Sequence, residues 1–439
     1  MKVLRYLAIL AVVVGIASCQ LHAKYTVGGN VTGLRGAGLV LEDNSGDASS
    51  VTANGAFTFS SGVTNGDAYS VTVSTQPSNP TQTCTVHNGS GTIDRADITN
   101  VVVNCTQAGR FAYVANQGSN DISAFAIDST SGVLTPIAGS PFASTGTGPV
   151  AVAIDPDETY LFVVNNGSDD VSVYSIDYTT GALTLSGVSI ATGHAPTSVV
   201  IDPADQYLYV TNSSDNTVSA FTLSSGAATA ITGSPYAVGK SPFALKTDPG
   251  GNFLYVTNFT DGTVSVFTIG EGTGELTAIS GSPFDAGAGS VAIAIDPADT
   301  FAYVANETAA TISSYSINST TGALVAVSGS PFGTSTSPES LAVNPAGNFL
   351  YAANVTSKND IAAYAITPST GAITLGTAIG AETFPLSVVV DPMGQFVYAA
   401  NDTSGDVSVY TADATTGALT AVAGSPFVSG TGARSVAIY

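Results

Sequence analysis

A four-residue motif, Tyr-Val-Ala/Thr-Asn and its close variants, occurs seven times in this chain, always at the same place in a unit of about 47 residues. Consecutive copies begin 49, 47, 46, 48, 48 and 47 residues apart. Repeats of roughly 40 to 50 residues that contain four short strands are typical of β-propeller blades. The repeat therefore predicts an all-β ring of seven blades. The copies are residues 113–116, 162–165, 209–212, 255–258, 303–306, 351–354 and 398–401.

Each unit has the pattern of four short strands separated by turns. In the second unit an apolar run, 150–154, stops at Asp155-Pro156, a pair favoured at the start of a type I turn. The motif strand follows and ends in an Asn- and Asp-rich hairpin turn, and a third strand ends before a Thr-Gly turn that leads into a short outer strand. Nothing between these turns has an apolar spacing long enough for a substantial helix.

The two ends of the repeat region indicate how the ring closes. The unit that begins at Arg110 lacks an innermost strand, whereas residues 434–439 match the innermost strand of every other unit. We therefore expect the last strand to complete the first blade, which leaves no unpaired sheet edge in the ring. The predicted fold is a seven-bladed β-propeller closed by the C-terminal strand.

Residues 109–439 resemble the YVTN-repeat seven-bladed β-propellers, a group that includes 6-phosphogluconolactonase-like proteins of the lactonase family. The resemblance rests on the repeated motif and covers about three quarters of the chain. It implies the propeller fold, with lactone hydrolysis as an activity of the group. The motif itself specifies fold rather than chemistry, because propellers carry their sites on loops outside the repeat.

The N-terminus resembles the export signal of a bacterial lipoprotein. Lys2 and Arg5 precede an apolar run that is too short to span a bilayer, and residues 16–19 resemble a lipobox ending in Cys19. We expect a signal peptide at 1–18 and a lipid on Cys19, which would attach the protein to a membrane. The alternative is an ordinary secretory signal with a coincidental cysteine. Because Gln20 follows the cysteine, the resemblance favours the outer membrane of the cell envelope.

The other two cysteines indicate whether the protein folds in an oxidising cellular compartment. With Cys19 assigned to the lipid, Cys84 and Cys105 remain as a pair, and an exported protein meets oxidising conditions. We expect a disulfide between them, and two free thiols are the alternative. Both lie in residues 24–106, where short strands separated by Gly, Asn and Ser predict a small antiparallel β-sandwich, similar to Ig-like or prealbumin-like modules. We interpret this domain as a spacer before the propeller at 109–439.

Charge limits the partners that this chain can bind. Its formal net charge is −22, and residues 109–439 contain only five Lys and Arg residues. No basic stripe is available for a phosphate backbone, so we expect no nucleic-acid binding. The acidic excess also repels anionic surfaces. The partners that remain are the membrane, through the lipid, and a protein or glycan of the cell envelope.

The candidate site comprises polar residues near the starts of the innermost strands. Lactone hydrolysis requires a general base for water and a cation that stabilises the oxyanion. His194 is the candidate base, with Arg434 and Glu339 as further catalytic candidates, and Lys240, Lys246 and Glu382 as ligand-binding candidates. Lys246 lies deeper than the others, where we expect its ammonium to point into the central channel. Alternatively, all six are ordinary solvated side chains.

The Asp-rich hairpins after the motif strands are a second constellation, with calcium or sugar hydroxyls as conceivable ligands. Asp and Asn are favoured in such turns for backbone geometry alone, and the single carboxylates lack the density of a calcium loop. We therefore expect no metal and no cofactor. From the sequence, a binding or scaffolding module at the cell envelope is the preferred function, and a lactonase-family hydrolase acting at the channel mouth is the alternative.

Overall fold

The computed structural model describes residues 23–439 except 35, 45, 79–81, 107–109, 188, 335 and 356–358. The chain divides into two compact units, Met1–Gln107 and Ala108–Tyr439, and each is described by itself. The expected signal peptide and Cys19 lie outside the described residues. No helix in the part that the structure describes is long and apolar enough to cross a membrane.

The first unit is a sandwich of two four-stranded sheets. Their strand orders are β5-β2-β10-β8 and β4-β3-β7-β9, and β1 pairs with β6. Alternate residues of the strands face inward, so that Val27, Val31, Leu39 and Leu41 are fully buried. The strands are β1 (Lys24–Tyr25), β2 (Val27–Thr32), β3 (Leu39–Asp43), β4 (Asp47–Val51), β5 (Gly55–Thr58), β6 (Val63–Thr64), β7 (Ala68–Thr75), β8 (Thr83–His87), β9 (Ser90–Thr92) and β10 (Ile98–Thr106).

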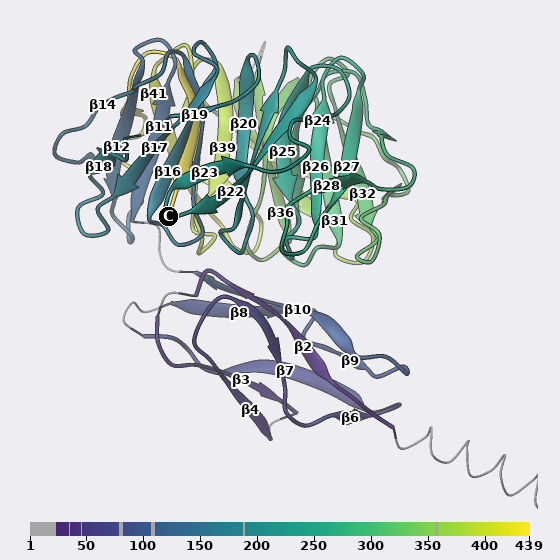
Figure 1. Ribbon diagram of the computed structural model, residues 1–439. Helices are drawn as coiled ribbons and strands as arrows, with labels where there is room; N and C mark the ends of the chain where they lie inside the picture. Colours follow the sequence, from purple (N-terminus) through teal and green to yellow (C-terminus); the bar gives the residue numbers. More distant parts are fainter. Residues whose placement is uncertain are drawn as a thin grey trace, which may run out of the picture. The chain divides into compact units, whose positions relative to one another are not determined.

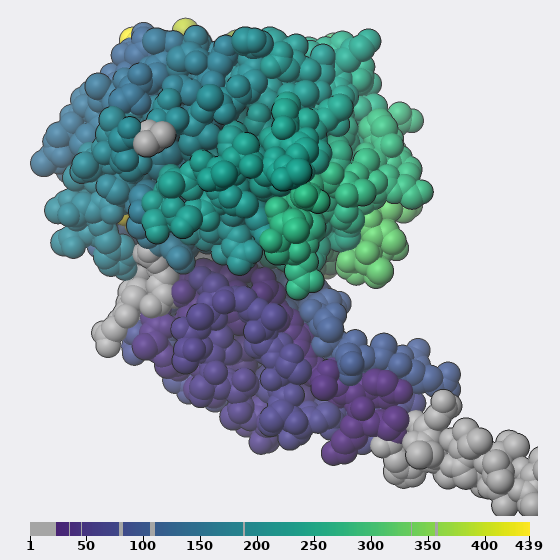
Figure 2. All heavy atoms as spheres, in the orientation of Figure 1, coloured from purple at the N-terminus to yellow at the C-terminus, as the bar shows by residue number. Residues whose placement is uncertain are grey.

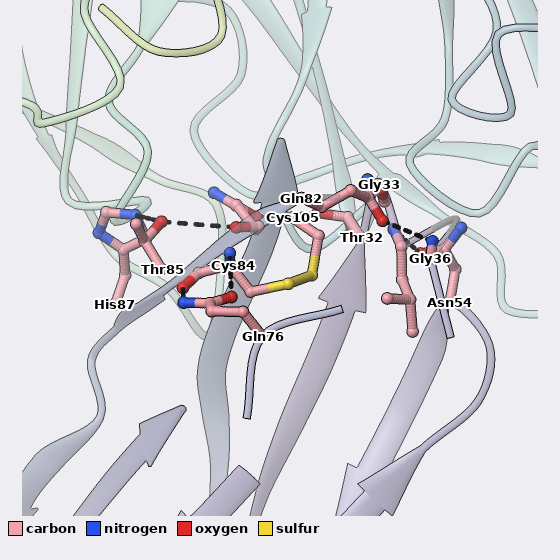
Figure 3. The surroundings of a disulfide bond; sticks show 12 residues. Thr32, Gly33, Gly36, Asn54, Gln76, Gln82, Cys84, Thr85, His87 and Cys105 are labelled. Atoms are coloured by element: carbon pink, nitrogen blue, oxygen red, sulfur yellow. Dashed lines mark hydrogen bonds between the residues drawn. A yellow bond between two sulfur atoms is a disulfide. The ribbon is translucent and has the colours of Figure 1, made fainter. Parts of the chain in front are cut away.

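A disulfide joins Cys84 of β8 to Cys105 of β10 (Figure 3). The two cysteines face each other in the antiparallel ladder, and the side chain of Gln76 brackets Cys84 by bonding to both its N–H and its carbonyl. This pairing agrees with the expectation from the cysteine count. On its other edge β10 pairs with β2 in parallel, a strand direction that the alternation of residues did not reveal.

The second unit is a ring of seven sheets, as the repeat predicts (Figure 1). Each blade has four main strands in an antiparallel meander, ordered from the channel outward, and in all blades except the sixth a separate two-residue strand pairs with the third strand. The innermost strands are β15 (Pro149–Ile154), β20 (Pro196–Ile201), β25 (Pro242–Thr247), β30 (Ser290–Ile295), β35 (Ser337–Val343), β39 (Pro385–Val390) and β44 (Ala433–Ile438).

The motif forms the second strand of each blade. These strands are β11 (Phe111–Asn116), β16 (Tyr160–Asn165), β21 (Tyr207–Asn212), β26 (Phe253–Asn258), β31 (Phe301–Asn306), β36 (Phe349–Val355) and β40 (Phe396–Asn401). The third strands are β12 (Asp121–Ile127), β17 (Asp170–Ile176), β22 (Thr217–Ser224), β27 (Thr263–Ile269), β32 (Thr311–Ile317), β37 (Asp360–Ile366) and β41 (Asp406–Ala412).

The outer strands are short. They are β13 (Leu134–Pro136), β18 (Leu183–Leu185), β23 (Ala227–Ala230), β28 (Leu276–Ala278), β33 (Leu324–Ala326), β38 (Ile373–Gly380) and β42 (Leu419–Ala421). The separate two-residue strands are β14 (Phe142–Ala143), β19 (Ile190–Ala191), β24 (Tyr236–Ala237), β29 (Phe284–Asp285), β34 (Phe332–Gly333) and β43 (Phe427–Val428).

The last strand closes the ring, which confirms the expectation from the strand pattern. β44 pairs antiparallel with β11, with Ile438 opposite Ala112 and Val436 opposite Val114. The first blade is therefore built from both ends of the propeller sequence. Because β44 supplies its innermost strand, the ladder edge of β11 is not left open.

The asparagine of the motif has a structural role in every blade. Asn212, for example, is fully buried and donates from its side-chain nitrogen to Thr217 Oγ1 at 3.0 Å and to Ser219 Oγ at 2.9 Å. Its side-chain oxygen accepts the N–H of Gly193. The asparagine thus fixes the hairpin to the next strand, and this structural role explains its recurrence in the motif.

Aromatic side chains of the motif strands hold neighbouring blades together. Tyr113 is fully buried, and its hydroxyl donates to the carbonyl of Gly181 in the next blade at 2.8 Å. Tyr209 makes the same bond to Gly274 at 2.9 Å. Apolar clusters fill the space between adjacent sheets, and in Figure 2 the atoms of neighbouring blades form a continuous wall on the visible side.

Candidate active site

A cavity of about 250 Å³ lies where the seven innermost strands begin. Every innermost strand contributes two consecutive residues to its wall, and these residues lie at a register shift near the start of each strand, as a β-bulge produces. Gln117 and Asn166, which follow motif asparagines, complete the wall. The strand residues are Val150, Ala151, Thr197, Ser198, Phe243, Ala244, Val291, Ala292, Glu339, Ser340, Leu386, Ser387, Arg434 and Ser435.

In the described part of the cavity wall Glu339 is the only carboxylate, and its environment changes its acidity. Burial and, to a lesser extent, the charge of Glu307 raise the pKa of Glu339, Arg434 acts in the opposite direction, and the net pKa is about 7. The carboxyl group makes no hydrogen bond to the described residues. A group with a pKa near 7 and unoccupied oxygens is suited to accept a proton from water at neutral pH.

Among the residues that the structure describes, Arg434 is the only cation in the cavity wall. Its guanidinium Nη1 lies 4.0 Å from Oδ1 of Asp402, and the side chain is one third exposed. At that distance the carboxylate orients the guanidinium by charge and does not form a short hydrogen bond with it. Among the described residues Arg434 has no hydrogen-bond acceptor for its side chain, so its N–H groups are available to an anionic ligand.

Three serine hydroxyls, those of Ser340, Ser387 and Ser435, form an arc along the wall that begins beside Glu339 and ends beside Arg434. Ser340 Oγ accepts the N–H of Val388 at 3.1 Å, and Ser387 Oγ accepts that of Val436 at 3.3 Å. Ser435 Oγ accepts the N–H of Val152 at 3.4 Å. Each serine therefore links its blade to the next one. A hydroxyl that accepts a backbone N–H still has its own hydrogen to donate, and all three hydroxyls lie in the cavity wall.

The opposite side of the cavity is aromatic. Phe243 lines the wall, and its ring packs against Phe259 with 6.4 Å between the ring centroids and 38° between the planes. The cavity thus has a charged, hydroxyl-rich side on the sixth, seventh and first blades and an apolar side on the fourth. This combination fits a small ligand with a polar reacting group and a partly apolar ring face.

Of the six residues selected from the sequence, the structure brings Glu339 and Arg434 together in the cavity wall. His194 does not line the cavity: its side chain is 74% exposed, and Nδ1 lies 2.9 Å from Asp169 Oδ2. The hydrogen bond with Asp169 and the charge of Asp215 raise the pKa of His194, which favours the protonated ring. Its role as the base stays a prediction, and the geometry favours Glu339.

Lys240 and Glu382 are exposed on the loops that lead into β25 and β39, and neither lines the cavity. The backbone of Lys240 is fixed by its N–H, which donates to Asp261 Oδ2 at 2.8 Å. Lys246 lies further along the channel than the cavity wall, and water reaches its side chain. The ligand-binding roles of Lys240, Lys246 and Glu382 therefore stay predictions.

The Asp residues of the hairpins contribute to blade contacts. Asp169 Oδ1 accepts the N–H of Ala195, and Asp121 Oδ1 accepts a bond from Asn116. These bonds support the turn-forming interpretation of the hairpin acids. In the described part of the chain no group of three or more His, Cys, Asp or Glu residues is arranged to hold a metal ion.

Sequence reasoning missed the serine arc and Phe243. A signal was present, because the three serines of the arc and Ser198 occupy a column in which the other three blades have alanine: Ala151, Ala244 and Ala292. Phe243 likewise stands where other blades have Val150 and Val291. The periodic pattern did not show that two adjacent residues of each innermost strand face the channel, since strict alternation would place them on opposite sides.

Comparison with solved structures supports the fold. A candidate 6-phosphogluconolactonase of Bacteroides uniformis is 20% identical with a TM-score of 0.68, and covers 76% of this chain and 100% of its own. The periplasmic gluconolactonase of Pseudomonas aeruginosa is 19% identical with a TM-score of 0.66, and covers 75% of this chain and 99% of its own. A search of curated proteins finds none that matches.

A protein family described as lactonase, seven-bladed β-propeller, matches the chain in three overlapping segments, 68–200, 188–278 and 242–433. Together the segments extend over well more than half of the sequence. The ring of seven blades and its closure by β44 agree with that description. The chain therefore belongs to the lactonase family of seven-bladed β-propellers.

Proposed function

We propose that this protein hydrolyses a lactone in the cavity at the mouth of the propeller channel. The observation that carries the proposal is the joint position of Glu339 and Arg434 in one cavity wall, where the pKa of Glu339 is raised to about 7. A base and a cation around one small cavity supply the two elements that water attack on an ester carbonyl requires. No cofactor is needed for this reaction.

In the proposed mechanism the Glu339 carboxylate removes a proton from a water molecule as its oxygen attacks the lactone carbonyl carbon. The carbonyl oxygen becomes an oxyanion, and the Arg434 guanidinium and a serine hydroxyl of the arc donate hydrogen bonds to it. When the intermediate collapses, the ring C–O bond breaks, and protonated Glu339 returns its proton to the leaving ring oxygen. The product is the open hydroxy acid.

Two considerations favour the hydrolase over the binding or scaffolding module preferred from the sequence. The chain belongs to the lactonase family, and the residues of the cavity wall combine in a way that a passive scaffold does not require. The name of the Pseudomonas aeruginosa relative is that of a periplasmic gluconolactonase, which supports a sugar-derived lactone as the substrate to test first. An envelope protein or glycan partner remains compatible with the exposed loops.

Replacement of Arg434 by alanine is expected to lower kcat for lactone hydrolysis by about 10²- to 10³-fold, the usual cost of removing one oxyanion donor. The measurement is the initial rate of acid release from glucono-1,5-lactone, with the spontaneous rate subtracted.

His194→Ala distinguishes the two candidate bases and should change kcat by less than about threefold, because His194 lies outside the cavity wall. Loss of activity in His194→Ala together with full activity in Arg434→Ala would assign catalysis to His194 and exclude Arg434 as the oxyanion donor.

We also propose that the protein is exported, attached through a lipid on Cys19, and located at the outer membrane, with the sandwich unit as a spacer. The disulfide between Cys84 and Cys105 supports an oxidising compartment. We expect the mature chain to begin with acylated Cys19, and Cys19→Ala to move the protein from the membrane fraction to the soluble fraction. A mature chain that begins at another residue, found by mass spectrometry, would refute this.

A further inference from the structure

Lys246 is a single amine in an apolar section of the channel. It is the fifth residue of β25 and follows Ala244 by two positions, and Ala244 lines the cavity. Because side chains alternate along a strand, both residues face the same side, with Lys246 further along the channel. In the other six blades the matching residues are small and apolar: Ala153, Val200, Ala294, Ala342, Val389 and Ala437.

The amine of Lys246 is accessible to solvent. Water reaches the side chain, and among the described residues no carboxylate forms an ion pair with it and no group hydrogen-bonds to it. Protein nevertheless surrounds it closely, and this desolvation lowers the pKa of Lys246. A larger share of the unprotonated, nucleophilic amine is therefore present than for an ordinary surface lysine.

We propose that Lys246 is a modification site at which lactones that enter the channel acylate the amine. The Nζ lone pair attacks the lactone carbonyl carbon, the ring C–O bond of the tetrahedral intermediate breaks, and the ring oxygen takes a proton from the nitrogen. The product is a stable amide that bears a free hydroxyl group. The lactone is the only co-reactant, and no atom leaves the adduct.

The inference rests on the proposed function only in the choice of a lactone as the ligand. Acylation uses Lys246 alone, whereas turnover uses Glu339 and Arg434 at the cavity. The amide would remove the positive charge and fill part of a channel whose matching residues are alanine and valine. The modified chain would thus differ from the unmodified one in charge and in channel volume.

The test uses the full chain treated with glucono-1,5-lactone at pH 8, followed by proteolysis and mass spectrometry of the lysine-containing peptides. We expect the rate of adduct formation at Lys246 to exceed that at Lys240, which is exposed on the rim, by at least about fivefold. Lys246→Arg, which keeps the charge without a comparable nucleophile, should lose this adduct alone. An adduct rate at Lys246 equal to or below that at Lys240 would overturn the proposal.

A second variant separates the two proposals. Glu339→Gln should stop turnover and keep acylation of Lys246, because a variant that does not hydrolyse the lactone leaves more of it to react with the amine. Acylation without turnover in the wild-type protein would remove the proposed hydrolase and leave the Lys246 site standing. Turnover without acylation of Lys246 in the wild-type protein, or absence of the Lys246 adduct in the inactive Glu339→Gln variant, would remove the Lys246 site alone.

Discussion

Replacement of Glu339 by glutamine should lower kcat/KM for lactone hydrolysis by about 10²- to 10⁴-fold, the range that a positioned general base contributes. Glutamine keeps the size and hydrogen-bonding shape of the side chain, so the fold and the affinity for substrate should change little. The loss should therefore appear in kcat with KM nearly unchanged, because the interaction removed exists only in the transition state.

The matched control is Glu271→Gln, which removes a carboxylate on an exposed turn of the same propeller, outside the cavity wall. Its kcat and KM should equal those of the wild-type protein. Both variants are measured by continuous titration of the released acid, with thermal unfolding as a check that they are folded. Activity of Glu339→Gln within twofold of wild type would refute the role of this carboxylate as the base.

Deletion of residues 433–439 should open the ring and produce the largest loss of stability. The segment supplies β44, whose backbone pairs with β11, and it buries Val436 and Tyr439 between blades. Burial of two such side chains contributes about 4 kcal/mol, before the lost ladder is counted. Unfolding of the propeller should shift downward by about 10 °C or more, and the exposed edge of β11 should promote aggregation.

Arg434→Ala is the control for this deletion, because it removes the charged side chain of the segment and keeps the strand. Thermal unfolding followed by far-ultraviolet circular dichroism and light scattering should show wild-type stability for Arg434→Ala and early aggregation for the deletion. A soluble deletion variant with an unchanged melting temperature would contradict the account of ring closure.

The architecture of the propeller could be predicted because its repeated residues are structural. The motif asparagine fixes each hairpin, as Asn212 does through Thr217 and Ser219, and the motif tyrosine bonds to the next blade, as Tyr113 does to Gly181. The asparagine contact recurs in every unit, and Tyr209 and Tyr255 repeat the tyrosine bond; such contacts leave a periodic trace. Closure by β44 followed from the same periodicity, since the first unit lacked one strand.

The site was harder to predict because its residues are the exceptions to the repeat. Glu339 and Arg434 could be selected as polar outliers, but their neighbours depend on the β-bulges and on contacts between blades. His194 lies on the loop that leads into β20, and only the position of Asp169 in the preceding blade shows that its ring is engaged elsewhere. The raised pKa of Glu339 depends on burial and on Glu307, 32 residues earlier in the sequence.

The most direct test of the proposed function is the pH dependence of kcat/KM for glucono-1,5-lactone. Because the pKa of Glu339 is about 7, the carboxylate that acts as the base is present above that pH and is lost as the pH falls below it. We expect kcat/KM, corrected for spontaneous hydrolysis, to rise through a midpoint near 7 and reach a plateau, and Glu339→Gln to lack this transition. No turnover above the spontaneous rate, or a transition that persists in Glu339→Gln, would contradict catalysis by this cavity.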